Sequence, residues 1–284
     1  MKVVKAFAIT AGVLAVVIGM VVVGAIIWAG YNKVPLPVED RCEATAAQRL
    51  TAIDPEQARN AAIISGMSIK RGLVPRAASI ALATAYQESD IRNLDYGHAD
   101  SIGLFQQRPS KGWGTIEQIM DPWYSTRSFY RVMERIKNWQ TKDINDVAQA
   151  VQRSAFPEAY RKHVDRARTL ASSLTGESPA TFTCVVAHPK PANAAEMKTF
   201  LSKTLGDTVT ITATDTGLTV TATEVRIAWA AAHEAIAVAG EYGLISVQVG
   251  PASWTRSTTA LPQWQGTPGA DTTVTLTFTQ PSPR

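Results

Sequence analysis

The segment PRAASIALATAYQ, residues 75–87, is apolar on nearly every face, which predicts a buried core helix within a helical stretch from about residue 50 to residue 174. The first helix is expected to begin after Asp54, because Pro55 suits the first helical position and Gln57 completes a capping box. It should end near Gly72. The stretch is expected to be α-rich, without regular strands beyond any in the loop after Glu88. Further helices are predicted over residues 75–88, 124–139, 144–154 and 157–174.

The last third of the chain has a different pattern. A linker rich in Ser, Thr and Pro is expected over residues 175–193, and a helix over residues 194–205. Two alternating Thr-rich runs, TVTITAT and LTVTAT, are joined by a turn containing Asp and Gly, which predicts a β-hairpin. An Ala-rich helix over residues 224–239 and two strand-like runs, LISVQVG and TVTLTFT, follow. Residues 194–284 are therefore expected to form a small α/β domain of unknown role.

The N-terminus predicts a membrane anchor. About 24 apolar residues run from Ala6 to Ala29, and a bilayer core of roughly 30 Å needs about 20 helical residues. Lys2 and Lys5 precede this run, so the positive-inside rule predicts a cytoplasmic N-terminus in the cell membrane and an extracytoplasmic bulk of the chain. Residues 1–30 are thus expected to form a single-pass transmembrane helix, with residues 31–48 as a spacer. The alternative is a long cleaved signal peptide, which would also export the chain.

Two cysteines, Cys42 and Cys184, bracket the predicted helical domain. In an exported protein such a pair is expected to form a disulfide, and closing so long a loop contributes on the order of 4 to 5 kcal/mol in the chain-entropy model. Two unpaired buried thiols are the alternative. A cysteine peptidase that uses Cys184 and His188 is a weaker hypothesis, because no strained nucleophile turn surrounds these residues.

One carboxylate stands at an unusual place. Glu88 closes the predicted helix of residues 75–88, whose side chains are apolar on nearly every face. Partial burial and the negative end of a helix dipole both disfavour the ionised carboxylate, so both should raise its pKa toward the range that a general acid needs. The simpler alternative is a solvated last turn that has no chemical role.

The neighbours of Glu88 strengthen the chemical interpretation. A Glu-Ser pair at residues 88–89 is followed by a polar loop and then by SIGLFQQ, with Ser101, Gly103, Leu104, Phe105 and Gln106. Together these motifs resemble the lysozyme-like superfamily, specifically the soluble lytic transglycosylase type, over roughly residues 50–172. The segment AQAVQRSAFPEAY is similar to a later helix of that family. It carries Val151 and Gln152 where the family usually has Tyr and Asn.

The resemblance implies an α-rich, lysozyme-like catalytic domain over residues 49–174, acting on peptidoglycan as a lytic transglycosylase or lysozyme-like glycosidase. Glu88 would act first as general acid and then as general base, while the N-acetyl group of the substrate stabilises the intermediate and its 6-hydroxyl completes the ring. The family motifs, together with nearby aromatic and amide side chains, predict a set of substrate-binding residues: Ser89, Tyr96, Ser101, Phe105, Gln106, Gln107, Trp113, Gln152 and Tyr160.

A hydrolase would need a second carboxylate at a fixed separation from Glu88. Asp95 and Asp100 are the candidates, and both lie in the loop that follows. Asp90 is nearer, but a residue two positions along a helix does not share its face. We favour the transglycosylase mechanism and keep a hydrolase with Asp95 or Asp100 as the alternative.

Charge and composition narrow the remaining classes. The net charge is +4 and the basic residues are dispersed, so nucleic acid is not an expected partner. The four histidines lack a zinc spacing, and no metal or cofactor is expected. Trp254 and Trp264 in the last domain would either stack on a ligand or close a small core.

The leading hypothesis is therefore a membrane-anchored, extracytoplasmic enzyme that cleaves the glycan strands of peptidoglycan. The alternative is a catalytically idle lysozyme-like module that binds glycan or scaffolds an envelope machine, such as a secretion or conjugation apparatus. Its partners would then be proteins of that machinery.

Overall fold

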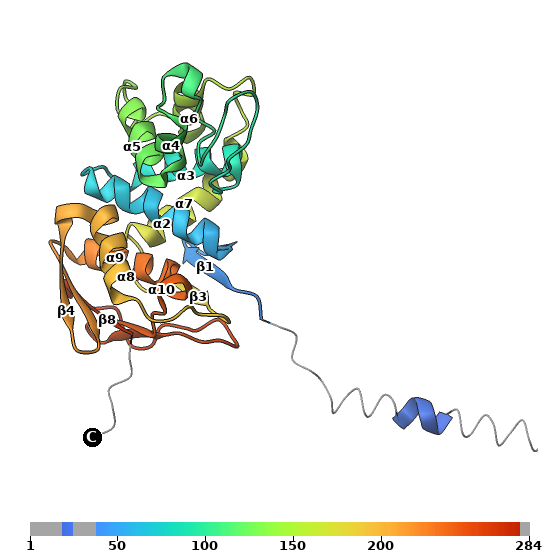
Figure 1. Ribbon diagram of the computed structural model, residues 1–284, viewed down its shortest axis with the longest axis vertical. Coiled ribbons are helices and arrows are strands. Elements are labelled where there is room, and N and C mark those ends of the chain that lie inside the picture. Colours follow the sequence, from blue (N-terminus) through green and yellow to red (C-terminus); the bar gives the residue numbers. More distant parts are fainter. Residues whose placement is uncertain (1–18, 25–37, 279–284) are drawn as a thin grey trace, which may run out of the picture. The chain divides into compact units, whose positions relative to one another are not determined.

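The computed structural model describes residues 19–24 and 38–278 (Figure 1). The chain divides into two units, residues 1–37 and 38–284, each of which is considered by itself. In the first unit, the described residues 19–24 are helical, with exposed side chains at Met20 and three following valines.

The predicted transmembrane helix, and with it the single-pass membrane localisation, is corrected by the structure. Among the described residues, no helix combines the length and the apolar character that a membrane span requires. A span needs about 20 helical residues in succession, and the helix described within the predicted anchor has only those of residues 19–24. The rest of the predicted span, residues 6–18 and 25–29, lies outside the described residues.

A three-stranded antiparallel sheet joins segments from distant parts of the chain. β1 (Arg41–Ala46) lies between β2 (Arg49–Ile53) and β3 (Phe182–Val185). Cys42 stands opposite Cys184 across β1 and β3, and the two form the predicted disulfide. The expectation of an α-rich domain is wrong here. β1 and β3 lie in the predicted spacer and linker, and β2 occupies the first residues of the predicted helical domain.

Helices make up most of the chain between β2 and β3. α2 (Pro55–Lys70) begins with the predicted capping box: the side chain of Asp54 accepts from Gln57 N at 3.0 Å, and Gln57 Oε1 accepts from Asp54 N at 3.1 Å. The other elements of this part are α3 (Pro75–Ser89), η1 (Pro109–Lys111), α4 (Ile116–Met120), α5 (Pro122–Met133), α6 (Ile144–Gln152), η2 (Arg161–His163) and α7 (Val164–Leu174).

The C-terminal part is a five-stranded antiparallel sheet packed against helices, as the α/β pattern of this region predicted. The predicted hairpin is β4–β5, in which Thr212 pairs with Thr219. Apolar strand residues are buried under α8 and α9, while most of the alternating threonines are exposed. The elements are α8 (Ala194–Leu205), η3 (Gly206–Thr208), β4 (Val209–Thr214), β5 (Gly217–Ala222), α9 (Val225–Ala237), α10 (Ala239–Tyr242), β6 (Ser246–Val249), β7 (Ala252–Thr255) and β8 (Thr273–Thr277), in sheet order β4-β5-β8-β6-β7.

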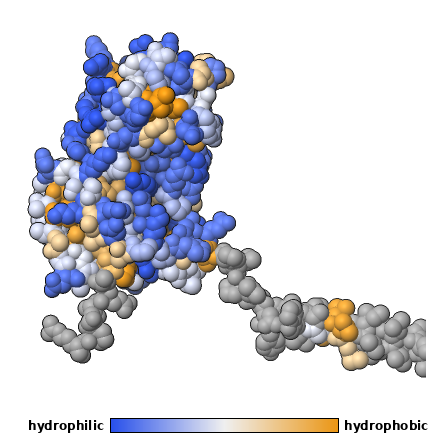
Figure 2. Space-filling model, viewed as in Figure 1, coloured by the Kyte–Doolittle hydropathy of each residue, from blue (hydrophilic) through white to orange (hydrophobic). Residues whose placement is uncertain are grey.

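α2 links the two parts of the second unit. It packs against α3 and α5 and also against α8 and α9, so one hydrophobic core runs through both parts (Figure 1). The fold is therefore mixed α/β with two antiparallel sheets, which corrects the predicted fold class. The face of this unit seen in Figure 2 is mainly hydrophilic, with hydrophobic residues in small separate patches. The proposed domain boundaries stay a prediction.

A fully buried carboxyl group lies where these helices meet. Glu234 of α9 is 0% exposed, and neither oxygen of its carboxyl group has a hydrogen-bond partner among the described residues. A methyl group on Gly66 of α2 would collide with this carboxyl and with Thr204 of α8, so the glycine makes the space for it. Burial raises the pKa of Glu234 well above its ordinary 4.5.

We therefore expect Glu234→Gln to remove a loss of stability that develops as the pH rises above about 4.5. The folded protein keeps a proton on Glu234 that the unfolded chain releases above its ordinary pKa of 4.5, so stability falls as pH rises toward the raised pKa. Relative to Glu234→Gln, the wild type should lose about 1.4 kcal/mol per pH unit within that window. Urea unfolding from pH 4 to pH 9 measures the difference, and parallel curves would contradict it.

Candidate functional site

Glu88 lies in the last turn of α3 and is half-buried. The helix ends there because Asp90 and Ile91 both adopt left-handed backbone angles, with φ of 54° and 58°. A β-branched residue rarely takes this conformation, which costs of order 1–3 kcal/mol. Contacts from neighbouring elements must therefore hold the turn in place.

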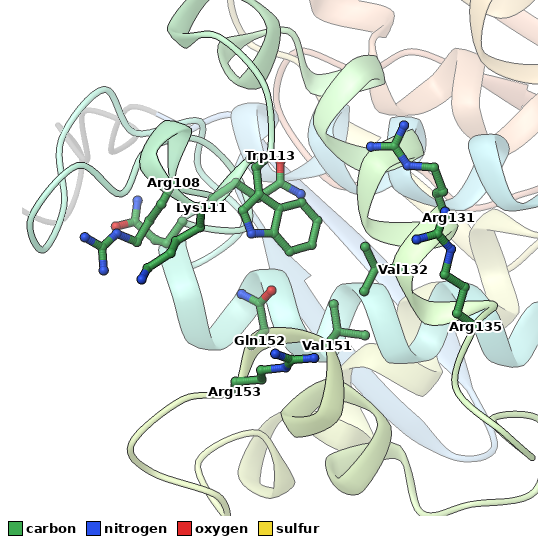
Figure 3. A pocket seen from close by; sticks show the side chains of 12 residues that line it. Arg108, Lys111, Trp113, Arg131, Val132, Arg135, Val151, Gln152 and Arg153 are labelled. Carbon is green, nitrogen blue, oxygen red and sulfur yellow. The ribbon is translucent and has the colours of Figure 1, made fainter.

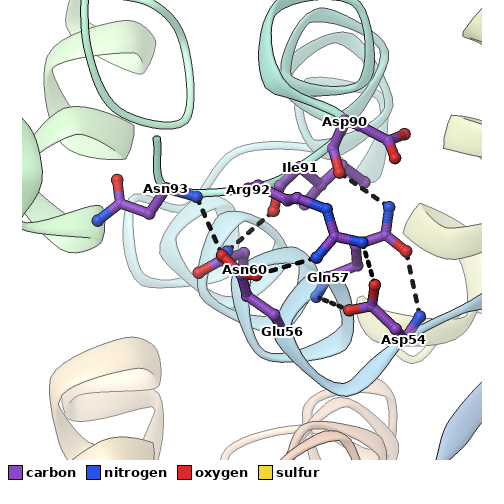
Figure 4. A network of polar contacts seen from close by, with 8 residues as sticks. All are labelled: Asp54, Glu56, Gln57, Asn60, Asp90, Ile91, Arg92 and Asn93. Carbon is purple, nitrogen blue, oxygen red and sulfur yellow. Dashed lines mark hydrogen bonds and ion pairs between the residues drawn. The ribbon is translucent and has the colours of Figure 1, made fainter. Parts of the chain in front are cut away.

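Side chains of α2 supply those contacts (Figure 4). Gln57 Nε2 donates to Asp90 O at 2.8 Å, and Asn60 Nδ2 donates to Ile91 O at 2.9 Å. Both amides thereby satisfy backbone carbonyls of the turn that follows α3. The start of α2 fixes where α3 ends, and with it the position of Glu88.

The loop after α3 is fastened to the same turn. The hydroxyl of Ser89 lies 2.7 Å from Leu104 O and 3.1 Å from Ala85 O, and its side chain is buried. Ile102 and Gln107 exchange two backbone hydrogen bonds, at 3.0 and 2.9 Å, and so close the end of the loop. Ser89 thus connects the helix carrying Glu88 to the run SIGLFQQ.

The carboxyl group of Glu88 has a defined electrostatic environment. Burial raises its pKa above the ordinary 4.5, while hydrogen bonds from Tyr160 and Gln152 lower it part of the way back. Tyr160 Oη donates to Glu88 Oε1 at 2.8 Å. The group is therefore easier to protonate than a solvated glutamate, yet its carboxylate form keeps hydrogen-bond donors. Both forms are needed by a residue that gives up a proton and later takes one.

A pocket of about 660 Å³ lies beside these residues. Gln152 belongs both to the pocket lining and to the surroundings of Glu88. Figure 3 shows that the lining side chains come from the loop with Arg108 and Trp113, from α5 and from the end of α6. Among the predicted binding residues, the pocket brings together Gln106, Gln107, Trp113 and Gln152.

The other predicted binding residues lie elsewhere. Phe105 is fully buried and stacks on Phe129, with ring centroids 4.6 Å apart, so it belongs to the core. Ser101 is also buried, and Tyr96 is 68% exposed. Tyr160 is buried too, but its hydroxyl reaches Glu88 directly. The aromatic and Gly-rich composition of the loop did not distinguish these positions.

Of the two candidate second carboxylates, Asp100 has structural partners. It accepts hydrogen bonds from Ser110 N at 2.8 Å and from Arg108 Nε at 2.6 Å. These hydrogen bonds hold the pKa of Asp100 well below its usual range, and those from Ser110 have a larger effect than the one from Arg108. Asp95 is exposed on the loop. Asp100 therefore stays ionised and has a role in fastening this loop.

The basic side chains of the pocket were not predicted from the sequence. Arg108 and Lys111 come from the loop, Arg131 and Arg135 from α5 and the turn after it, and Arg153 from the end of α6. Arg131 and Arg135 are four residues apart, the spacing that places two side chains on one helix face. That spacing was the available signal, but their approach to the loop and to α6 depends on tertiary structure.

Several other predictions concern places away from this pocket. Cys184 is in the disulfide and so has no thiol for peptidase chemistry. The indoles of Trp254 and Trp264 donate to Thr183 Oγ1 and Phe182 O, both at 2.9 Å, so they close the core around β3. In the part of the chain that the structure describes, no three His, Cys, Asp or Glu side chains come together as metal ligands.

Comparison with known proteins adds no assignment to this geometry. Neither a scan against models of protein families nor a search of curated proteins gave a match.

Proposed function

We propose that this protein cleaves the glycan strand of peptidoglycan, with Glu88 as general acid and then general base. The observation that carries the proposal is the half-buried carboxyl of Glu88, whose pKa is raised by burial, next to a pocket of about 660 Å³. The resemblance of its surrounding motifs to lytic transglycosylases supports the same chemistry.

The proposed reaction uses each protonation state of Glu88 once. The protonated carboxyl gives its proton to the glycosidic oxygen as the bond to the sugar carbon breaks, and the N-acetyl oxygen of the substrate bonds to that carbon. The Glu88 carboxylate, which accepts from Tyr160 Oη, then takes the proton of the 6-hydroxyl. The 6-oxygen displaces the acetamido oxygen and closes an anhydro ring.

The environment of Asp100 favours this route over hydrolysis with a second carboxylate. Its two carboxylate oxygens accept hydrogen bonds from Arg108 Nε and from Ser110 N. These contacts give Asp100 a structural role in the loop instead of a role as nucleophile or base. Gln152 supports the alternative of an idle module, because its amide donates to Phe105 O at 2.8 Å and so has a structural role.

Mass analysis of the products from purified peptidoglycan tests the proposal. The full-length protein should release fragments with anhydro ends. Reducing ends would instead indicate a hydrolase. If the protein binds the strands stably but releases no product, at protein concentrations equal to those of the strand ends, the proposed enzymatic activity is refuted. The alternative of a glycan-binding or scaffold module would then be retained.

A further inference from the structure

The pocket beside Glu88 has an unusual charge. Its lining contains no carboxylate, and only Arg108 forms an ion pair, with Asp100. Within residues 38–278, the other four basic side chains of the lining, Lys111, Arg131, Arg135 and Arg153, form no ion pair. The pocket's cations are Arg108, Lys111, Arg131, Arg135 and Arg153.

Such a cluster opposes the usual distribution of surface charge. Protein surfaces generally intersperse positive and negative side chains, because like charges repel. The net charge of the whole protein is only +4, so five cations around one pocket are a local concentration of positive charge. Burial and the hydrogen bonds of Tyr160 and Gln152 account for the pKa shift of Glu88, so these cations do not serve as its counter-ions. Four of them, all but Arg108, line the pocket without an acidic partner among the described residues.

The walls of the pocket suit a sugar that carries an anionic group. In the view of Figure 3, Arg108 and Lys111 lie on one side of Trp113, and Arg131 and Arg135 lie on the other. An indole and small apolar side chains can contact a sugar ring, while guanidinium groups match carboxylates through two parallel hydrogen bonds.

We propose that these cations bind carboxylates of the glycan strand next to the bond that Glu88 cleaves, so that the substrate is an anionic strand. The inference rests on the proposed function. The carboxylates come either from the lactyl group of the sugar, which is free where the stem peptide is absent, or from the stem peptide itself. Neutral strands of the same backbone are then poor ligands.

The test compares the double variant Arg131→Gln/Arg135→Gln with Arg127→Gln as a matched control. Arg127 is an exposed residue of the same helix, but it does not line the pocket and lies over the ring of Tyr124. Binding is measured by co-sedimentation in the background of Glu88→Gln, so that no cleavage is required. Four kinds of glycan strand serve as ligands. Two are charged: strands that carry the stem peptide, and strands from which an amidase has removed it. The other two are the same strands after their carboxyl groups have been converted to amides.

We expect conversion to amides to weaken binding about 10-fold for the protein with intact arginines and for the Arg127→Gln control. On charged strands, the double variant should bind about as weakly as the intact protein binds amidated strands. Conversion of the strands to amides should weaken binding by the double variant little further, because the arginines that would bind the carboxylates are already absent. Dependence on charge in amidase-treated strands indicates the lactyl carboxylate, and dependence confined to peptide-bearing strands indicates the peptide.

Equal losses for the double variant and the control would overturn the inference, whatever the activity of the protein. Conversely, charge-dependent binding through Arg131 and Arg135 by a wild type that releases no product would leave the site intact and refute only the proposed cleavage. Raising the salt concentration should weaken binding of the charged strands alone.

Discussion

Replacing Glu88 by glutamine should lower the rate of glycan cleavage by about 10²- to 10⁴-fold. Glutamine keeps the shape of the side chain, and its amide oxygen can accept the hydrogen bond that Tyr160 Oη donates to Glu88 Oε1. It cannot give a proton to the leaving oxygen or take one from the 6-hydroxyl. Product release from purified peptidoglycan, followed by mass analysis, measures the loss.

The same substitution should leave the fold at least as stable as the wild type near neutral pH. Burial raises the pKa of Glu88, so ionising this group in the folded protein opposes folding as pH rises from 4.5 through the raised pKa. The amide removes that dependence. Thermal unfolding of the two proteins at pH 7 separates a chemical loss from a folding defect.

The candidate second carboxylates provide the matched controls. Asp95→Asn should keep nearly full activity, because Asp95 lies exposed on the loop. Asp100→Asn should cost more than Asp95→Asn but far less than Glu88→Gln, because it weakens the contacts with Arg108 and Ser110. If either Asp variant is as inactive as Glu88→Gln, the reaction uses two carboxylates and the transglycosylase route is wrong. Full activity in Glu88→Gln would refute the role of Glu88 altogether.

Local signals predicted several elements well. The capping residues Asp54 and Gln57 marked the start of α2, and Pro75 marked the start of α3. The alternating threonines of β4 and β5 predicted their pairing, because one face of the hairpin had to be apolar and the other polar. In each case the information lay within a few neighbouring residues.

The sheet of β1, β2 and β3 shows why other elements escaped prediction. β1 and β3 pair Arg41 with Val185 and Cys42 with Cys184. The two cysteines predicted that these segments meet, but nothing within either short segment predicted that they form strands. β-propensity also depends strongly on context. The strands are therefore stabilised by tertiary contacts that no local pattern contains.

The candidate site divides in the same way. The position of Glu88 at the end of an apolar helix was readable because helix periodicity is local. The donors to the turn after it, Gln57 and Asn60, belong to another helix. The basic cluster likewise depends on how α5, α6 and the loop approach one another, which the dispersed arginines along the chain did not reveal.

Removing the disulfide should cause the largest loss of stability among the substitutions considered. Cys42 and Cys184 are separated by 142 positions, and a cross-link that closes so long a loop stabilises by about 5 kcal/mol in the chain-entropy model. Measured losses for native disulfides are typically about 2–5 kcal/mol. For a unit of this size each kcal/mol lowers the melting temperature by about 2–4 °C.

The double variant Cys42→Ala/Cys184→Ala tests this expectation by urea unfolding, because it leaves no unpaired thiol. Both sulfurs are buried, so the substitution also removes some apolar packing, and wild type unfolded in a reductant separates that contribution from the cross-link. Thiol labelling of the denatured wild type should fail until the reductant is added. A double variant that unfolds at the same urea concentration as the oxidised wild type would show that the pairing of β1 with β3 holds the chain without the bond.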